Sequence, residues 1–399
     1  MPTPKQLFLA HLGQTSPFPM LIEISSAKGS IMYGPDGKEY IDLISGVSVS
    51  NTGHGNPRVV EAVKKQADSY MHLMVYGEFI QTPQVEYARL LTSLLPGSLG
   101  KCYFVNSGSE AVEGALKLAK RYTNRSRIIS FKNSYHGSTH GALSIQGSEK
   151  YRNSFRPLLP DIFHAEINSE AAIDMIDDKT ACVIVEPVQG EAGVRKCSSV
   201  FLENLRKKCD ETGTLLIFDE IQTAFGRTGK MFAFEHSGVI PDVLLLAKAL
   251  GGGMPLGAFI SSDTIMSSLM SDPVLGHITT FGGHPVSCAA GMASLQIILE
   301  NNLGDSSNEK SKLYRNNLKH QLITEIRGDG LLLAVSLAHP SYVAYAIAHA
   351  PEYGIILDYF LFCEDAFRIA PPLIISEDEI MESCSRLINL LDAAMENVK

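Results

Sequence analysis

The chain has 399 residues, of which 45% are hydrophobic, and a formal net charge of −9. This length and composition predict a large buried core and exclude a disordered or repeat protein. The acidic balance argues against nucleic acid or an anionic membrane surface as a partner, because either would reward a basic face.

In chain order, the first fifty residues predict a short helix and then two strands, 30–33 and 39–42, joined by a turn at 34–37. We expect this hairpin to lie outside the main sheet. From about residue 55 to 290, short β-rich runs alternate with longer amphipathic segments. The expected strands are 103–105, 128–131, 182–185, 215–218 and 243–247, and the expected helices are 110–122 and 200–211. This alternation predicts an α/β fold with a mainly parallel sheet covered by helices on both faces.

The pattern changes beyond about residue 290. A long helix leads to an acidic and polar stretch, 305–312, and then to a strand at 330–337. We therefore expect a division into three parts. These parts are an N-terminal segment, 1–54, that belongs to a smaller domain or forms a dimer arm, a large domain, 55–290, and a smaller C-terminal α+β domain, 291–399.

An acid and an amine follow two of the apolar runs. Asp219 closes the run 215–218, and Lys248 closes the run 243–247. In open α/β sheets ligands gather beyond the carboxyl ends of the strands, so we expect both side chains in one site. Pyridoxal phosphate needs this pair, because a lysine amine holds its aldehyde and a carboxylate keeps its ring nitrogen protonated. Taken singly, Asp219 would be a turn former or helix cap and Lys248 a solvated side chain.

Residues 106–110 (Asn-Ser-Gly-Ser-Glu) follow a strand and open a helix. Backbone amides and serine hydroxyls there face the positive end of the helix dipole. Ser107, Gly108 and Ser109 are therefore candidates for binding the cofactor phosphate. The alternative is a plain helix cap, with Ser107 or Ser109 capping and Glu110 in the first turn.

Tyr135, His136 and Gly137 come just after the strand 128–131. The Tyr135 ring would stack on a flat cofactor, Gly137 would let the backbone approach closely, and His136 lies between them. The alternative is a packed loop tyrosine. His136 and His140 have i,i+4 spacing, but no acidic residue or third histidine is near them in the sequence, so we expect no metal site.

Two carboxylates, Glu186 and Glu191, share the loop after strand 182–185. In isolation such a pair would suggest a glycosidase, but nothing else in the sequence does. Arg368 is a candidate clamp, because its planar fork can grip both oxygens of a substrate carboxylate or of Glu191. The alternative for Arg368 is a surface salt bridge.

The seven cysteines are odd in number, scattered and never spaced as CxxC. This usage predicts reduced thiols and a cytoplasmic location. Residues 1–12 show no secretion signal, and no apolar stretch approaches the roughly 18 to 20 residues needed to cross a bilayer. We therefore expect no membrane partner.

Taken together, the motifs resemble those of the class III aminotransferases, fold type I pyridoxal phosphate enzymes that include ornithine, acetylornithine and 4-aminobutyrate aminotransferases. The resemblance runs through nearly the whole chain. Its most specific passages are NSGSEAVEGALKLAKR from Asn106, YHG from Tyr135, VEPVQGEAGV from Val185, FDEIQTAFGRTGK from Phe218, LLAKALGGGMPLGA from Leu245, TTFGGHP from Thr279 and FRIAPPL from Phe367. It implies a large domain with a mostly parallel sheet between helices and a smaller α+β domain.

The resemblance also assigns roles, residue by residue. It makes Lys248 the lysine that holds the cofactor and Asp219 the partner of the ring nitrogen. Gln222 would approach the phenolic oxygen of the cofactor, and Tyr135 would stack on its ring. Glu186 would lie nearby.

Further roles implied by the resemblance concern the phosphate and the substrate. Gly108 and Ser109 would hold the phosphate, and Thr280 would reach it from the neighbouring subunit, which implies a homodimer with two shared sites. Glu191 and Arg368 would pair while the distal amine of a donor reacts. They would part when the arginine binds the α-carboxylate of glutamate or 2-oxoglutarate.

Two positions depart from the family pattern. Ornithine and acetylornithine aminotransferases typically have an arginine three residues after the stacking aromatic, where this chain has Ser138. That arginine binds the distal carboxylate of the acceptor, so another basic residue must substitute here or a different acceptor such as pyruvate is used. His284 replaces the asparagine that usually follows the paired glycines.

The resemblance therefore implies a pyridoxal-phosphate-dependent aminotransferase. It would move the terminal amine of an ornithine-like or other ω-amino donor to a 2-oxo acid, 2-oxoglutarate above all, by a ping-pong mechanism. An aminomutase of the glutamate-1-semialdehyde type and a pyruvate-dependent ω-transaminase are alternatives within the same chemistry. The retention of Lys248 and Asp219 disfavours a non-catalytic binding protein, and the missing dinucleotide fingerprint disfavours a nucleotide-dependent oxidoreductase.

Overall fold

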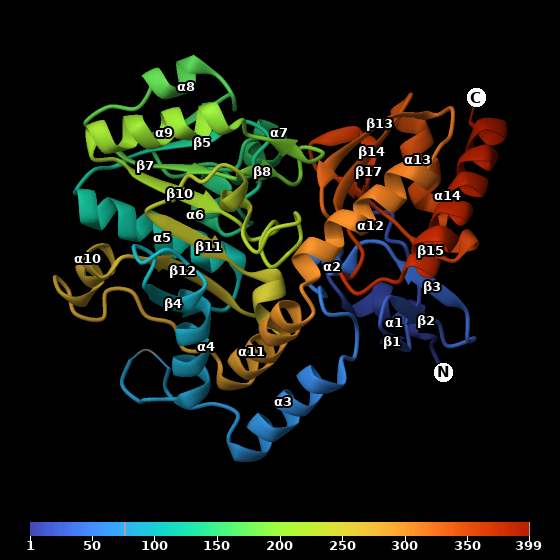
Figure 1. The fold of residues 1–399 in the computed structure, drawn as a ribbon, viewed down its shortest axis with the longest axis horizontal. Helices are drawn as coiled ribbons and strands as arrows, with labels where there is room; N and C mark the ends of the chain where they lie inside the picture. Colours follow the sequence, from blue (N-terminus) through green and yellow to red (C-terminus); the bar gives the residue numbers. More distant parts are fainter. Residues whose placement is uncertain (76, 399) are drawn as a thin grey trace.

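The computed structural model describes residues 1–75 and 77–398, and a seven-stranded sheet forms the centre of its larger part (Figure 1). In spatial order its strands are β4 (Lys101–Val105), β12 (Gly257–Ser261), β11 (Val243–Leu246), β10 (Leu215–Asp219), β7 (Thr180–Val185), β5 (Arg127–Phe131) and β6 (Ile162–Ala165). The pairs among β11, β10, β7, β5 and β6 are parallel, and β12 runs antiparallel to both of its neighbours. The predicted α/β class with a mostly parallel sheet is confirmed.

Apolar runs explain the central strands. Every residue of β7, β10 and β11 is buried, as expected for a sheet covered on both faces. The sequence analysis missed β6 and β12, because β6 is interrupted by His164 and β12 begins with the small residues Gly257 and Ala258.

Helices α5 (Gly108–Thr123) and α9 (Ser199–Thr212) match the two expected helices to within two residues at each end. α5 packs closely on the sheet, since a Cβ atom at Gly114 would lie 2.4 Å from the Phe259 ring. Further helices are α1 (Pro4–His11), α2 (Ser45–Ser48), α3 (Pro57–Ser69), α4 (Thr82–Ser93), α6 (His140–Ser144), α7 (Glu149–Arg152), α8 (Glu170–Asp174), α10 (Asp263–Met266) and α11 (Pro285–Glu300). Within the described residues, none of the helices is long and apolar enough to cross a bilayer.

The C-terminal part builds a second sheet in the order β13-β14-β17-β16, with helices packed beside it (Figure 1). Its elements are α12 (Leu303–Asn317), β13 (Ile323–Asp329), β14 (Leu332–Leu337), α13 (Pro340–His349), β15 (Ile355–Ile356), β16 (Asp358–Phe360), β17 (Cys363–Ile369) and α14 (Glu377–Asn397). The acidic stretch 305–312 lies inside α12. The sequence shows no apolar stripe there because small serines, Ser307 and Ser311, occupy buried positions.

The N-terminal hairpin joins the C-terminal part. β2 (Ile31–Tyr33) and β3 (Glu39–Asp42) pair antiparallel, as predicted, and lie outside the main sheet. β1 (Ser26–Lys28) adds to one edge of this hairpin, and β15 pairs parallel with β3 at the other. Both ends of the chain therefore lie on the same side of the molecule (Figure 1).

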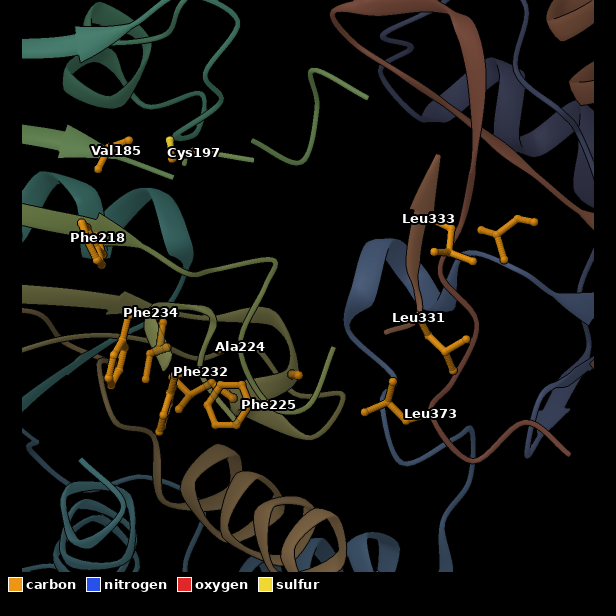
Figure 2. Packing of buried hydrophobic residues seen from close by; sticks show 14 of the residues in the cluster. Val185, Cys197, Phe218, Ala224, Phe225, Phe232, Phe234, Leu331, Leu333 and Leu373 are labelled. Atoms are coloured by element: carbon orange, nitrogen blue, oxygen red, sulfur yellow. The ribbon is translucent and has the colours of Figure 1, made fainter. Parts of the chain in front are cut away.

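One hydrophobic cluster runs across the junction between the two parts. Figure 2 shows Phe218, Phe225 and Phe232 on the side of the main sheet and Leu331 and Leu373 on the C-terminal side. All five side chains are at most 2% exposed. The junction is thus packed like a core, so a shift of one part against the other disturbs buried contacts.

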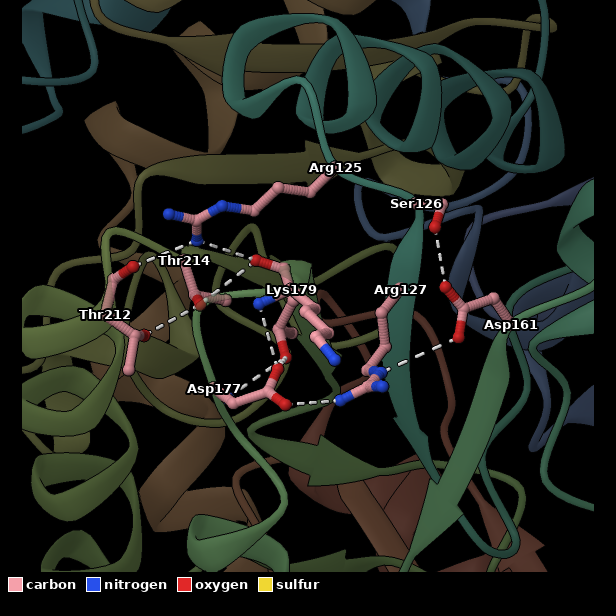
Figure 3. A network of polar contacts seen from close by, with 9 residues as sticks. Arg125, Ser126, Arg127, Asp161, Asp177, Lys179, Thr212 and Thr214 are labelled. Carbon is pink, nitrogen blue, oxygen red and sulfur yellow. Dashed lines mark hydrogen bonds and ion pairs between the residues drawn. The ribbon is translucent and has the colours of Figure 1, made fainter.

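A polar network lies at the end of the main sheet where the parallel strands begin (Figure 3). Nη1 of Arg125 donates to the carbonyl oxygens of Thr180, Thr212 and Gly213 at 2.9 to 3.2 Å. Arg127 donates to Asp177 at 2.6 Å. These contacts connect the amino ends of the strands, which lie opposite the carboxyl ends.

Candidate active site

A cavity of about 410 Å³ opens at the carboxyl ends of the central strands. Most of the residues singled out from the sequence line it. They include Ser107, Gly108, Ser109, Tyr135, His136, Gly137, Glu186, Glu191, Asp219, Gln222 and Lys248. Residues that the sequence analysis missed also line it, among them Val49, Ile221 and Met254. These are ordinary apolar residues, which carry no signal for a site.

Lys248 stands directly after β11, at the start of a 3-10 turn, Lys248–Gly251. Its φ angle of 52° lies in the left-handed region, which costs a side-chain-bearing residue about 1 to 2 kcal/mol. Such strain is concentrated at functional sites. Burial lowers the pKa of the Lys248 amine to about 8, so a neutral amine is far more available than on a surface lysine.

Asp219 is held rigidly at the end of β10. Its Oδ2 lies 2.7 Å from Nδ1 of His136, and its Oδ1 accepts the backbone N–H of Ile221 at 3.0 Å. Both side chains of the Asp219–His136 pair are buried. The histidine therefore fixes the orientation of a carboxylate that faces the same cavity as Lys248.

Glu186 joins two loops of the site. Its Oε1 accepts the backbone N–H of Tyr135 at 2.9 Å, and its Oε2 accepts that of Gly190 at 3.0 Å. The loop of the aromatic ring is thereby fastened to the loop that carries Glu191. Burial raises the pKa of Glu186 to about 7. The sequence analysis placed Glu186 near the site but assigned it no role.

Glu186→Gln is expected to lower the free energy of unfolding by about 1 to 3 kcal/mol, because an amide keeps only one acceptor and leaves one buried N–H unpaired. Affinity for pyridoxal phosphate should fall with it, measured by reconstitution of the cofactor-free protein. The pKa of Glu186 in the folded protein, about 7, exceeds the ordinary 4.5. This carboxyl therefore makes the free energy of unfolding fall as the pH rises from 4.5 to 7. The glutamine variant should lose this pH dependence.

Asp242→Asn is the matched control for that variant. Asp242 accepts the backbone N–H of Leu216 at 2.7 Å at the far end of the strands. This control should lower stability without changing cofactor affinity. Unchanged cofactor affinity in Glu186→Gln would show that the link between the Tyr135 and Gly190 loops does not support cofactor binding.

Arg368 and Glu191 form a buried ion pair. Nη2 of Arg368 donates to Oε1 of Glu191 at 2.7 Å, and the arginine is 1% exposed. The surface salt bridge considered for Arg368 is therefore wrong. The guanidinium lies 4.7 Å from the centre of the Phe360 ring and 3.8 Å from Asp358. Local sequence could not reveal these two neighbours, because they come from β16, which pairs with β17.

The segment 106–110 forms the helix cap that was considered for it, and the binding of a phosphate there stays a prediction. Ser107 is the N-cap of α5, and its Oγ accepts the N–H of Glu110 at 3.2 Å. The helix start nevertheless lines the cavity, with Gly108 and Ser109 in its first turn. A Cβ atom at Gly137 would lie 2.1 Å from Oγ of Ser109, so this close approach requires glycine.

Arg368 is not among the residues that line the cavity, but it contacts the lining residue Glu191. Thr280, Ser138 and His284 also lie outside the lining. Thr280 is exposed and outside the lining within one chain. Ser138 is exposed, with its Oγ 3.2 Å from the Tyr135 hydroxyl. His284 stacks on His72, with their ring centres 5.7 Å apart.

The family assignment follows from comparison with known proteins. The family model described as "Aminotransferase class-III" matches residues 13–391. This chain is a class III aminotransferase. The acetylornithine aminotransferase of Methanopyrus kandleri is 40% identical to it, over 96% of this chain and 97% of the relative. That of Methanocaldococcus jannaschii is 38% identical, over 95% and 94%.

Solved transaminase structures share the whole fold. The ornithine aminotransferase of Toxoplasma gondii superposes with a TM-score of 0.90 at 29% identity and covers 99% of this chain and 96% of its own. A transaminase of the marine bacterium Virgibacillus gives 0.92 at 27% identity, with 99% of both chains covered. The fold type I expectation is confirmed, and the aminotransferase is a pyridoxal-phosphate-dependent enzyme.

The cavity of the aminotransferase fits its cofactor. Oε1 of Gln222 and Nε2 of His136 are buried in the cavity wall without a hydrogen-bond partner among the described residues. A buried polar atom without a partner is costly, so both are suited to a polar ligand. Gly190 leaves the space that Gln222 occupies, since a Cβ there would lie 1.8 Å from Gln222 Oε1.

Proposed function

We propose that this aminotransferase moves the terminal amino group of an ornithine-like ω-amino donor to a 2-oxo acid, 2-oxoglutarate above all, by a ping-pong mechanism. The buried Glu191–Arg368 pair carries the proposal. The printed names of the relatives, acetylornithine and ornithine aminotransferases, support a donor of this class.

Bound pyridoxal phosphate supplies an electron sink for the carbon that bears the amine. We assign Lys248 the covalent attachment and the proton transfer at that carbon, with its depressed pKa of about 8 as the support. Asp219, oriented by His136, would hold the proton on the ring nitrogen. Tyr135 would stack on the ring, and the amides of Gly108 and Ser109 at the start of α5 would bind the phosphate.

The ion pair supports a donor that reacts through its distal amine. While Glu191 neutralises Arg368, the guanidinium of Arg368 is not free to draw an α-carboxylate to the reacting centre. A donor therefore reacts through an amine remote from its carboxylate. When Arg368 leaves Glu191, it can bind the α-carboxylate of the 2-oxo acid. One site thus serves both half-reactions.

A panel of amines crossed with 2-oxo acids tests the proposal. N-acetylornithine, ornithine and 4-aminobutyrate should be assayed with 2-oxoglutarate and with pyruvate, and the amino acid formed should be quantified. We expect the highest kcat/KM with an ornithine-like donor and 2-oxoglutarate. An enzyme that forms no amino acid from any added 2-oxo acid, and returns the amine to the same molecule, would instead be an aminomutase.

Ser138→Arg should raise the preference for 2-oxoglutarate over pyruvate by roughly 10- to 150-fold. The gain corresponds to one charge-assisted hydrogen bond of about 1.5 to 3 kcal/mol to the distal carboxylate. The ratio of the two kcat/KM values is the measurement, with Ser138→Gln as the uncharged control. An unchanged ratio would show that the distal carboxylate binds elsewhere.

We also propose that two chains form a homodimer with shared sites. The segments 71–75 and 270–281 touch through His72 and Phe281, whose ring centres are 4.6 Å apart. Together with residues 77–80 they expose large apolar side chains, among them Met71, Leu73, Met74, Phe79, Ile80, Met270, Val274, Leu275, Ile278 and Phe281. Such a surface is typical of an interface. Thr280 lies within it, where it could reach the phosphate of the other subunit. We also propose that the chain divides into domains at residues 54 and 290. A cytoplasmic location is likewise a proposal.

A further inference from the structure

Arg227 is a buried cation at the junction of three chain segments. Its Nη1 donates to the carbonyl oxygens of Leu331 at 2.9 Å and Pro371 at 2.6 Å. Its Nη2 donates to Oδ1 of Asn51 at 2.5 Å and to Oγ of Ser45 at 3.2 Å. The side chain is fully buried. One guanidinium thus ties the active-site loop to the N-terminal segment and to the C-terminal part.

All four acceptors are uncharged, which makes this burial costly. Asp42 is the acid that acts on Arg227 through its charge, but its own Oδ2 is taken by His54 at 2.7 Å. Burial lowers the pKa of Arg227 to about 9. An apolar side chain could fill this space without the desolvation penalty. What the arginine provides here, and an apolar side chain would not, is the set of hydrogen bonds that its fork makes.

Each of the three tied segments carries a residue of the active site. The loop with Arg227 begins at Asp219 and includes Gln222, and Val49, two residues before Asn51, lines the cavity. Pro371 follows Arg368 by three residues. A backbone hydrogen bond joins two of these segments as well, because the N–H of Leu331 donates to the carbonyl oxygen of Arg227 at 3.0 Å. Figure 2 shows the same junction, with Phe225 on one side and Leu331 on the other.

We propose that Arg227 is a positioning residue that fixes the end of β17, and with it Arg368, against Glu191 and the cavity. The inference rests on the proposed function, in which Arg368 alternates between Glu191 and a substrate carboxylate. Without the fork, the end of β17 loses its tie to the loop of Asp219. Arg368 then no longer stands at the distance that carboxylate binding requires.

The test compares Arg227→Met with Arg227→Lys and with a matched control. Arg125→Met is the control. Arg125 also donates hydrogen bonds to backbone carbonyls, but at the end of the sheet where the parallel strands begin (Figure 3). The holoenzymes are titrated with glutarate, an unreactive dicarboxylate, by calorimetry. Thermal melts and the KM for 2-oxoglutarate are measured in parallel. The half-reaction with a monoamine that has no carboxylate is followed by the cofactor absorbance.

Arg227→Met should raise the Kd for glutarate and the KM for 2-oxoglutarate by about tenfold or more, the scale of a misplaced binding group, while the monoamine half-reaction is unchanged. Arg227→Lys should lie between, because a point charge replaces part of the fork. Arg125→Met should lower the Tm alone. If Arg227→Met does not fold, Asn51→Ala, which removes one acceptor, should show the same selective rise.

Equal losses in both half-reactions, or a glutarate Kd that stays unchanged while the Tm falls, would overturn the inference. Glutarate binding needs no turnover. A wild-type enzyme that transfers no amine but binds glutarate in an Arg227-dependent way would therefore refute the proposed function alone. An active enzyme whose glutarate affinity is independent of Arg227 would refute this inference alone.

Discussion

Lys248→Ala is expected to lower transamination by a factor on the order of 10⁴ or more, because one change removes both the covalent attachment of the cofactor and the proton carrier at the reacting carbon. No other amine lines the cavity within the described residues, so no neighbour can take over. The proposed phosphate site at the start of α5 and the Asp219–His136 pair remain, and some cofactor binding should survive. The measurement is kcat with saturating donor and 2-oxo acid.

Lys248→Arg is the companion variant. It keeps a positive charge at the end of β11 but cannot bind the aldehyde, so it should be as inactive as the alanine variant. Lys230→Ala, at an exposed lysine, should leave kcat unchanged. Turnover by Lys248→Ala near the wild-type rate would refute the assignment.

Asp219→Asn should lower kcat by a factor on the order of 10²–10³, because an amide cannot hold a proton on the ring nitrogen by charge. The variant keeps the shape of the residue and can still accept the N–H of Ile221. The fold should therefore persist, and the loss should appear in kcat and in the visible spectrum of the cofactor rather than in the Tm.

Asp242→Asn is the control here as well, since it makes the same chemical change at the other end of the strands. It should lower stability and leave the cofactor spectrum as it is. A wild-type kcat in Asp219→Asn would show that the ring nitrogen does not depend on this carboxylate.

The sequence was sufficient to predict the central strands and the meeting of Asp219 with Lys248. Both residues end continuous apolar runs, and such runs in a parallel sheet have few alternatives to burial. The sequence also predicted that the start of α5 belongs to the site, because a helix cap and an anion site use the same residue types. Ser107 in fact caps α5 while the helix start lines the cavity.

Other features depend on contacts between distant segments and leave no local pattern. Phe360 and Asp358 flank Arg368 only because β16 pairs with β17. The acceptors of Arg227 come from residues 45, 51, 331 and 371, which no periodicity connects. α12 was missed because serines take buried positions that a hydrophobic pattern would assign to apolar residues.

The most direct test of the account is chemical trapping of the cofactor. The purified holoprotein is treated with borohydride, digested, and searched by mass spectrometry for a pyridoxyl adduct. We predict that the yellow colour is bleached, that the adduct maps to Lys248, and that Lys248→Ala carries none. An adduct on another lysine, or a holoprotein that holds no reducible adduct, would contradict it.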